Sequence, residues 1–248
     1  MKSIEDILYL VGDAAYSFFH NLMEFLNPSS REKPPEFRKL RKLIRRDLTP
    51  HEFLSLKLQM SFLLYLVFGL LVLILKVNPL WIFGSVIVEF LYIRYLINSY
   101  YEFFIDPRAY KTFYYTITWL TFGAFAGYII MRKIATEVYY YYIYLIAILI
   151  ITMTFREIFR RRHGRDYAYG IVEDVKNDLV RVFIHDDIAA NVKPNHYWLP
   201  KVPGAEQGAI VKVLVEDRAF RSARPVRILE VHPVQSSQSE TEPKDAAE

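Results

Sequence analysis

The sequence contains no cysteine, which excludes disulfide bonds, thiolate metal sites and a cysteine nucleophile. It also lacks a Walker-type loop, a Gly-x-Gly-x-x-Gly segment, a His-Glu-x-x-His pair and a Gly-x-Ser-x-Gly turn. These motifs hold phosphates, cofactors, zinc or a serine nucleophile. Without them, no motif in the sequence supports an enzymatic function. We therefore predict that the protein is not an enzyme, has no catalytic residue and binds no cofactor.

One short segment, His185-Asp186-Asp187, contains side-chain types that bind metals. Adjacent residues of a strand point to opposite faces, so at most two of the three could meet at one ion. We interpret the segment as a loop of solvated polar residues and predict no metal site.

Residues 165–231 lack a net charge, because they contain ten Lys or Arg and ten Asp or Glu residues. Phosphate binding requires a net basic field. We therefore expect no nucleic-acid partner for this part of the chain and predict a protein partner instead. The overall charge of +4 arises from basic runs elsewhere.

Long apolar segments dominate the middle of the chain, from residue 58 to residue 155. The four segments are Leu58–Leu75, Leu80–Ile97, Thr112–Ile130 and Val138–Phe155. The first and the fourth carry no charge, and eighteen residues at about 1.5 Å each span roughly 27 Å, close to the hydrocarbon thickness of a bilayer. The pattern predicts a bundle of four transmembrane helices, with a turn at Lys76-Val-Asn-Pro79 between the first two.

Glu89 lies near the middle of the second segment and defines a candidate intramembrane polar site. Its insertion cost of about 2.5–3.5 kcal/mol is offset by the apolar residues around it. Arg94 is about 140° further around the helix and is expected to reach the interface. A partner for Glu89 therefore comes from another segment, and Thr116, Thr118, Thr121 or a Tyr hydroxyl are the candidates. A structural protonated glutamate and an ion or proton site both remain open.

Gly123 and Gly127 form a small-x-x-x-small pattern in the third segment. This spacing favours close helix packing in lipid, although glycine can also occur at these positions without a packing role.

Basic residues flank the apolar block on both sides. They are Arg38, Lys39, Arg41, Lys42, Arg45, Arg46 and Lys57 before it, and Arg156, Arg160, Arg161, Arg162 and Arg165 after it. The positive-inside rule places both termini in the cytoplasm of a multi-pass cell-membrane protein, which agrees with an even number of spans. Contacts with anionic lipid are expected from Arg38, Lys39, Arg41, Lys42, Arg45, Arg46, Arg160, Arg161 and Arg162.

Residues 1–26 show apolar residues at alternating steps of four and three, which predicts an amphipathic helix. It could lie on the membrane surface, oligomerise, or pack on the C-terminal module, and the spacing favours none of these. Residues 27–57 are predicted to form a linker and a basic juxtamembrane helix, Glu36–Leu48. Thr49-Pro50-His51-Glu52 then has the pattern of a capped helix start.

Residues 165–232 change to a period of two, which is typical of strands. The predicted strands are Tyr169–Val175, Val180–Ile184, Trp198-Leu199, Ile210–Val215 and Val226–Val231, with a hairpin turn at Lys176-Asn177-Asp178 and a connection over Glu216–Pro225. Short strands in so few residues predict a small all-β barrel of the OB or SH3-like type. Residues 233–248 are expected to be a disordered tail.

Three segments carry a resemblance to known families. Phe155-Arg-Glu-Ile-Phe-Arg-Arg-Arg-His163 and Tyr169-Gly-Ile-Val-Glu-Asp-Val175 resemble an uncharacterised archaeal family of multi-pass membrane proteins, known from hyperthermophilic euryarchaea. Gly208-Ala-Ile-Val-Lys-Val-Leu-Val-Glu216 is loosely similar to the OB domains of NfeD-like proteins, which the resemblance links to stomatin-type scaffolds. Neither resemblance implies catalytic residues.

The sequence thus predicts a scaffold or adaptor that presents a cytoplasmic β module to a protein partner. The alternative is a small channel or transporter that uses Glu89. Membrane lipids, a protein partner and a second copy of the chain are the expected partners.

Overall fold

The computed structural model describes residues 4–31, 49–218 and 221–232, and the chain divides into two compact units between Gly164 and Arg165. The predicted helix Glu36–Leu48, with its six basic residues from Arg38 to Arg46, lies outside the described residues. The predicted tail, residues 233–248, lies outside them as well.

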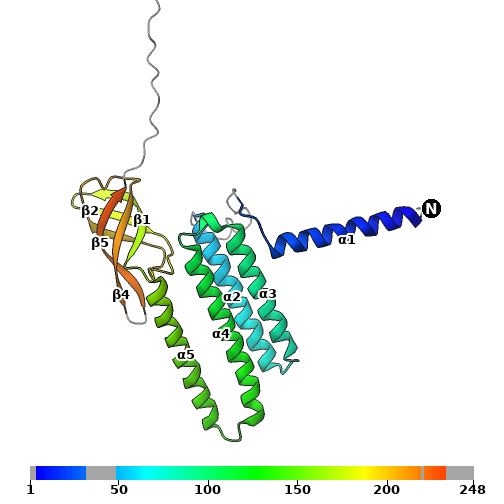
Figure 1. The fold of residues 1–248 in the computed structure, drawn as a ribbon. Coiled ribbons are helices and arrows are strands. Elements are labelled where there is room, and N and C mark those ends of the chain that lie inside the picture. The colour runs from blue at the N-terminus through cyan, green and yellow to red at the C-terminus, as the bar shows by residue number, and fades with distance from the viewer. Residues whose placement is uncertain (1–3, 32–48, 219–220, 233–248) are drawn as a thin grey trace, which may run out of the picture. The chain divides into compact units, whose positions relative to one another are not determined.

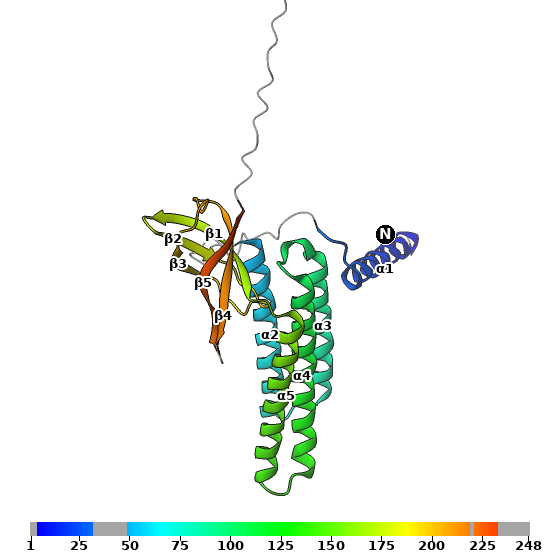
Figure 2. The same ribbon diagram turned by 60° about the vertical axis from the view of Figure 1, so that its left-hand side comes forward.

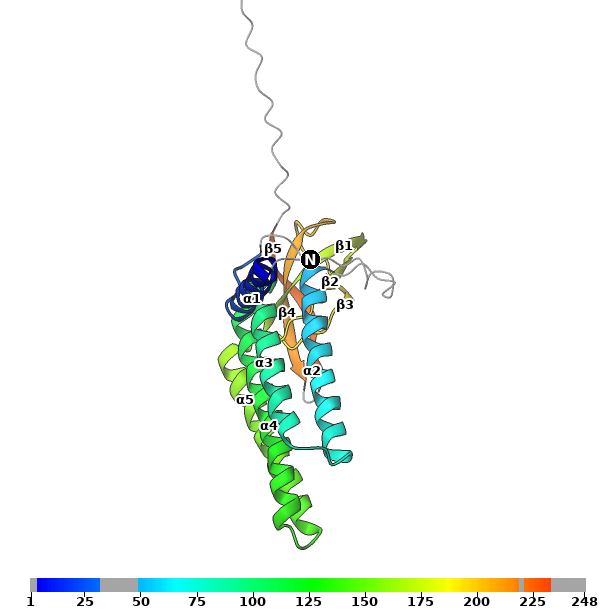
Figure 3. The ribbon, with the colours of Figure 1, turned by 90° about the vertical axis from the view of Figure 1, so that its right-hand side faces the viewer.

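The first unit is helical. It contains α1 (Ile4–Leu26), α2 (Pro50–Ile74), α3 (Leu80–Ser99), a short 3-10 helix η1 (Tyr101–Phe103), α4 (Pro107–Ile134) and α5 (Tyr139–His163). Within the described residues, α2 to α5 are each long and apolar enough to cross a membrane, which confirms the four predicted spans. These four helices run up and down beside one another (Figures 1 and 3). They extend beyond the predicted segments, because hydropathy marks the lipid-facing part of a helix and not its capped ends.

The start of α2 is fixed by the predicted capping box. The Glu52 amide donates to the Thr49 hydroxyl at 3.3 Å, and the Thr49 amide donates to Glu52 Oε2 at 3.0 Å. Pro50 occupies the first turn, where its missing N–H has no cost. In α4 the Asp106 side chain accepts from the Ala109 amide at 3.1 Å, so two helix starts have local side-chain caps.

The helices α2, α3 and α4 pack through one cluster of buried side chains. Its buried members are Tyr65, Val72, Ile82, Val86 and Phe125. Gly69 of α2 makes room for the Phe125 ring of α4, since a Cβ at Gly69 would lie only 2.1 Å from that ring. The missing side chain therefore sets how closely α2 and α4 approach.

The helix α1 contacts the other helices through its C-terminal end. The Phe25 ring stacks on the Tyr95 ring of α3 at 5.0 Å, and just beyond the helix Arg31 donates to the Tyr95 hydroxyl at 3.0 Å. Large apolar side chains nearer the N-terminus of the helix, including Tyr16 and Phe18, are exposed. These contacts do not decide between the three roles predicted for the N-terminal helix.

The second unit is a five-stranded antiparallel sheet that curls into a half-barrel. Its strands are β1 (Tyr167–Lys176), β2 (Leu179–Ile184), β3 (Asn195–Pro200), β4 (Ile210–Arg218) and β5 (Arg221–His232). The order β3-β2-β1-β4-β5 places β1 between β2 and β4, as in an OB fold, and thus favours the OB alternative over the SH3-like one. Figure 2 shows the curl of the sheet. The edge strands β3 and β5 contact each other, but no hydrogen-bonded ladder joins them among the described residues.

The predicted connection Glu216–Pro225 is too long. Most of it belongs to β4 and β5, which pair down to Arg218 and Arg221 with several irregularities in register. Pro225 is a loop signal in the sequence, but it pairs with Val215 in an edge strand, where a residue without an N–H is tolerated.

Apolar side chains that alternate along the strands fill the inside of the half-barrel. Fully buried members include Val172, Val180, Val182, Val211 and Val213. The register of β1 and β2 shifts between Val172 and Asp174. Glu173 is the additional residue of this β-bulge, and the bulge interrupts the alternation of β1.

Candidate functional site

A groove between α2 and α3 is a candidate site in the helical unit. Its volume is about 790 Å³. Its mostly apolar lining includes Phe53, Met60, Leu64, Phe68, Trp81 and Val88. We call it the α2–α3 groove. A concave apolar surface with a few polar groups is the usual form of a small-molecule site.

Glu89 is the central polar group of this groove. Glu89 is only 6% exposed, and the Ser61 hydroxyl of α2 donates to Glu89 Oε1 at 3.0 Å. Tyr65 is 4% exposed, and its hydroxyl has no hydrogen-bond partner among the residues that the structure describes. Lys57 lines one end of the groove, with its ammonium 4.6 Å from the centre of the Phe53 ring.

The partner of Glu89 therefore comes from another span, but it is a serine of α2 and not one of the predicted threonines of α4. Thr118 and Thr121 are buried on α4, and Thr116 is exposed. Sequence reasoning missed Ser61 because a single serine in an apolar helix has no distinguishing spacing. Arg94 is half-buried five residues before the end of α3, and no ion pair joins it to Glu89 among the described residues.

The two glycines of the small-x-x-x-small pattern have different surroundings. A Cβ at Gly127 would lie 3.1 Å from the Tyr144 ring of α5, so this glycine permits close packing of α4 and α5. The Tyr144 hydroxyl donates to the Ala124 carbonyl on the same side of α4. A Cβ at Gly123 would meet no atom within 4 Å.

The described basic residues predicted to contact anionic lipid lie in the last turn of α5. Arg160, Arg161 and Arg162 are exposed there. Arg161 pairs with Glu157 one turn earlier, with its Nε at 2.9 Å from Glu157 Oε1. Such an exposed pair adds little stability, so Arg161 can exchange Glu157 for an external anion at low cost.

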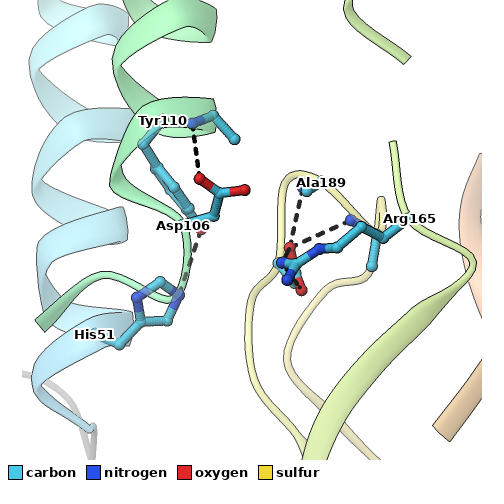
Figure 4. Close-up of polar contacts among 8 residues, drawn as sticks. His51, Asp106, Tyr110, Arg165 and Ala189 are labelled. Atoms are coloured by element: carbon cyan, nitrogen blue, oxygen red, sulfur yellow. Dashed lines mark hydrogen bonds and ion pairs between the residues drawn. The ribbon is translucent and has the colours of Figure 1, made fainter. Parts of the chain in front are cut away.

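A second polar cluster lies where α2 and α4 begin. Tyr110 is fully buried, and its hydroxyl lies 3.4 Å from Nε2 of His51 (Figure 4). The Tyr110 amide donates to the Asp106 carbonyl in the first turn of α4, at 3.2 Å. The Phe104 ring packs against both rings. The cluster holds two helix starts together and is enclosed by aromatic rings.

In the β module, Asp187 is a buried carboxylate, and the prediction of a solvated residue is wrong for it. It is 1% exposed, and Arg165 Nη2 lies 3.1 Å from its Oδ1 and 2.9 Å from its Oδ2 (Figure 4). The amides of Ala189 and Ala190 also donate to Oδ1. Burial opposes the charge on Arg165, but Asp187 and Tyr167 outweigh it and raise the pKa of the guanidinium. The residues next to Asp187 in the sequence do not predict this pairing, because Arg165 lies 22 residues earlier in the chain.

The described residues contain no group of three acidic or histidine side chains that could hold a metal ion. One arginine and two amides occupy the oxygens of Asp187.

The outward side of β4, β1, β2 and β3 carries a row of paired side chains. Ile210 pairs with Ile171, Ile171 pairs with Phe183, and Phe183 pairs with His196. Trp198 and Leu179 lie beyond this row and are exposed. We call these six residues the outer face of the module. Sequence reasoning identified the strands but not this face, because register decides which side chains become neighbours.

These features define a membrane protein with four spans and a C-terminal β half-barrel. The chain belongs to the DUF2101 family, described as predicted membrane protein, whose family model matches residues 22–229. This match confirms the expected membership of a family of membrane proteins. Comparison with curated proteins and with solved structures gave no match.

Proposed function

We propose that the protein is a membrane adaptor whose β module binds a protein partner through the outer face. The observation that carries this proposal is the exposure of four large apolar side chains on one side of a folded module. They are Ile171, Leu179, Trp198 and Ile210. Exposed apolar patches on small domains usually mark interaction sites.

The charges around the outer face favour a protein over a polyanion. Arg181 Nε lies 3.2 Å from Glu173 Oε2, and His196 Nδ1 lies 2.8 Å from the same oxygen. Arg181 is thus paired with a carboxylate of the module, and it offers little net field to a phosphate backbone. Aromatic and arginine side chains beside apolar ones are the usual composition of protein interfaces.

A pocket beside Trp198 gives the outer face a concave part. Its volume is about 460 Å³, and it is lined by the turn residues 176–178 together with Leu179 and Trp198. Lys176 Nζ lies 5.7 Å from the centre of the Trp198 ring. A partner side chain inserted there would contact a large aromatic surface, which is the arrangement of most interface hot spots.

The adaptor proposal is tested by affinity purification of the full-length protein from crosslinked native membranes. Leu179→Ala and Trp198→Ala are expected to remove a partner that the unmodified protein retains, with at least a roughly thirty-fold loss of affinity for Trp198→Ala. Leu229→Ala is the matched control, because Leu229 of β5 is 41% exposed and Leu179 is 45% exposed. Partners that survive deletion of residues 165–248, or that are lost equally with Leu229→Ala, would contradict the proposal.

Several finer expectations belong to the same proposal. Cytoplasmic termini would place the module on the side of the membrane where the basic residues of α5 meet the inner leaflet. The similarity of residues 208–216 to NfeD-like OB domains suggests a membrane-associated scaffold as the partner class. Both are supported by sequence alone, and cysteine accessibility at an introduced Ser17→Cys and Asp178→Cys tests the orientation.

A channel or transporter is the second candidate function, and the buried Glu89 supports it. The apolar lining of the α2–α3 groove offers few ligands to an ion, which weighs against this candidate. Ion or proton flux in liposomes that disappears with Glu89→Gln would favour it. Absence of flux in the unmodified protein would eliminate it.

A further inference from the structure

The α2–α3 groove contains hydrogen-bonding groups that its apolar packing does not require. The buried Tyr65 hydroxyl has no partner among the described residues, and Glu89 accepts a hydrogen bond from Ser61 through Oε1. The hydroxyls of Ser61 and Ser85 each also lie within hydrogen-bond distance of a carbonyl of their own helix, Leu58 at 3.1 Å and Ile82 at 2.9 Å. Buried polar groups in proteins are almost always paired. Tyr65 and Glu89 therefore indicate a ligand that brings its own polar group into the groove.

The dimensions of the groove favour a hydrocarbon chain over another helix. From Phe53 to Phe68 the lining follows α2 for roughly 22 Å at about 1.5 Å per residue. A helix about 10–12 Å wide would occupy roughly 2,000 Å³ over that length, more than twice the volume of about 790 Å³ that is present. At roughly 30 Å³ per methylene-sized group, a sixteen-carbon chain needs about 500 Å³.

The location of the groove points to the same class of ligand. Its walls come from two helices that are apolar enough to cross a membrane. Trp81 lies at the end of the groove near the α2–α3 turn, Lys57 lies near the other end, and Glu89 lies near the middle of α3. A ligand in this place enters from the lipid phase and is extended along the helices.

We propose that the α2–α3 groove binds a long-chain lipid whose hydroxyl group hydrogen-bonds with Tyr65 and Glu89. The hydrocarbon chain lies between α2 and α3 and extends toward Phe68 and Trp81. Tyr65 donates to the oxygen of the ligand, and a ligand hydroxyl donates to Glu89. This inference concerns the helical unit and is independent of the adaptor role of the β module.

Trp81 provides a direct measurement of occupancy, because it lines the groove. The probe is hexadecanol brominated on its chain, which quenches tryptophan fluorescence on contact. The measurement uses the full-length protein in phosphatidylcholine nanodiscs, with Trp119 and Trp198 replaced by Phe so that Trp81 is the only tryptophan. A matched protein that retains only Trp119 serves as the control, because Trp119 of α4 is 53% exposed and Trp81 is 59% exposed.

We expect the quenching of Trp81 to saturate as the probe concentration rises. The quenching of Trp119 should increase only in proportion to the probe concentration. Unlabelled hexadecanol should displace the probe, whereas hexadecane should not, since it lacks the polar group. Tyr65→Phe should weaken binding roughly three- to ten-fold. It removes only the buried hydroxyl and keeps the ring that packs between the helices, so the fold should be retained.

A second variant blocks the groove without changing its polar groups. Gly84 lines the groove, and a Cβ there would meet no atom within 4 Å, so Gly84→Leu should fill the groove and abolish saturable quenching. Gly123→Leu on α4 is the matched control, because a Cβ at Gly123 also meets no atom within 4 Å. Identical quenching of Trp81 and Trp119, equal competition by hexadecane, or full binding in Gly84→Leu would overturn the proposal.

Discussion

Removal of the Asp187 carboxylate should destabilise the β module strongly, because this side chain joins an arginine and two backbone amides. Asp187 is 1% exposed, and its oxygens accept from Arg165 at 2.9 and 3.1 Å and from the amides of Ala189 and Ala190 at 3.0 and 3.2 Å. Asp187→Ala would leave a guanidinium and two amides without their acceptor. These amides lie in the segment that leads from β2 to β3.

The expected loss follows from the burial of both partners. Removal of one member of a buried ion pair costs about 3–5 kcal/mol, because the other charge remains without compensation. The Arg165 side chain is 19% exposed, so water can replace part of the lost interaction. We therefore expect a loss of about 3 kcal/mol in the free energy of unfolding, a large fraction of the roughly 5–15 kcal/mol of a typical domain.

The loss can be measured with Trp198, the only one of the three tryptophans in the β module. Urea unfolding of the full-length protein in detergent, with Trp81 and Trp119 replaced by Phe, reports the module through Trp198 fluorescence. Asp187→Asn keeps an oxygen for the two amides and should lose less than Asp187→Ala. Asp166→Ala, at an exposed aspartate, is the control and should change the free energy of unfolding by less than about 0.5 kcal/mol. Equal midpoints for Asp187→Ala and Asp166→Ala would refute the reasoning.

Two further predictions concern the helical unit. Gly69→Ala should destabilise the bundle by about 1–3 kcal/mol, because the added Cβ would lie 2.1 Å from the Phe125 ring. Gly123→Ala is the control, since a Cβ there would meet no atom within 4 Å. It should have no such effect in the same detergent unfolding assay. Thr49→Ala removes the acceptor of the Glu52 amide and should cost about 1 kcal/mol. Faster amide hydrogen exchange confined to the first turn of α2 would confirm this, and unchanged exchange there would contradict it.

Features that depend on neighbouring residues can be predicted from the sequence. The four spans follow from continuous apolar runs, and the capping box at Thr49 follows from residue types three positions apart. The turn at Lys176-Asn177-Asp178 is predictable for the same reason, and Asn177 adopts the positive φ of 50° that this turn requires. Each of these signals is complete within a few residues of the chain.

Features that depend on residues distant in sequence can be predicted only in part. Glu89 stands out as an unusual charge, but its partner Ser61 does not, because 28 residues separate the two. Asp187 has the sequence surroundings of a solvated residue, since nothing near it in the chain indicates Arg165. Pro225 indicates a loop, whereas pairing with Val215 in an edge strand keeps it in β5.

The sequence by itself determined that the chain has four spans followed by strands, because hydropathy and side-chain period act locally along the backbone. Only the tertiary structure decided which side chains meet. The register of β1 to β4 places Ile171 between Ile210 and Phe183 on one face, and the packing of α2 against α3 forms a groove around Glu89. The reason is that a surface or a cavity is made by segments that converge in space, and their convergence depends on the packing of the whole unit.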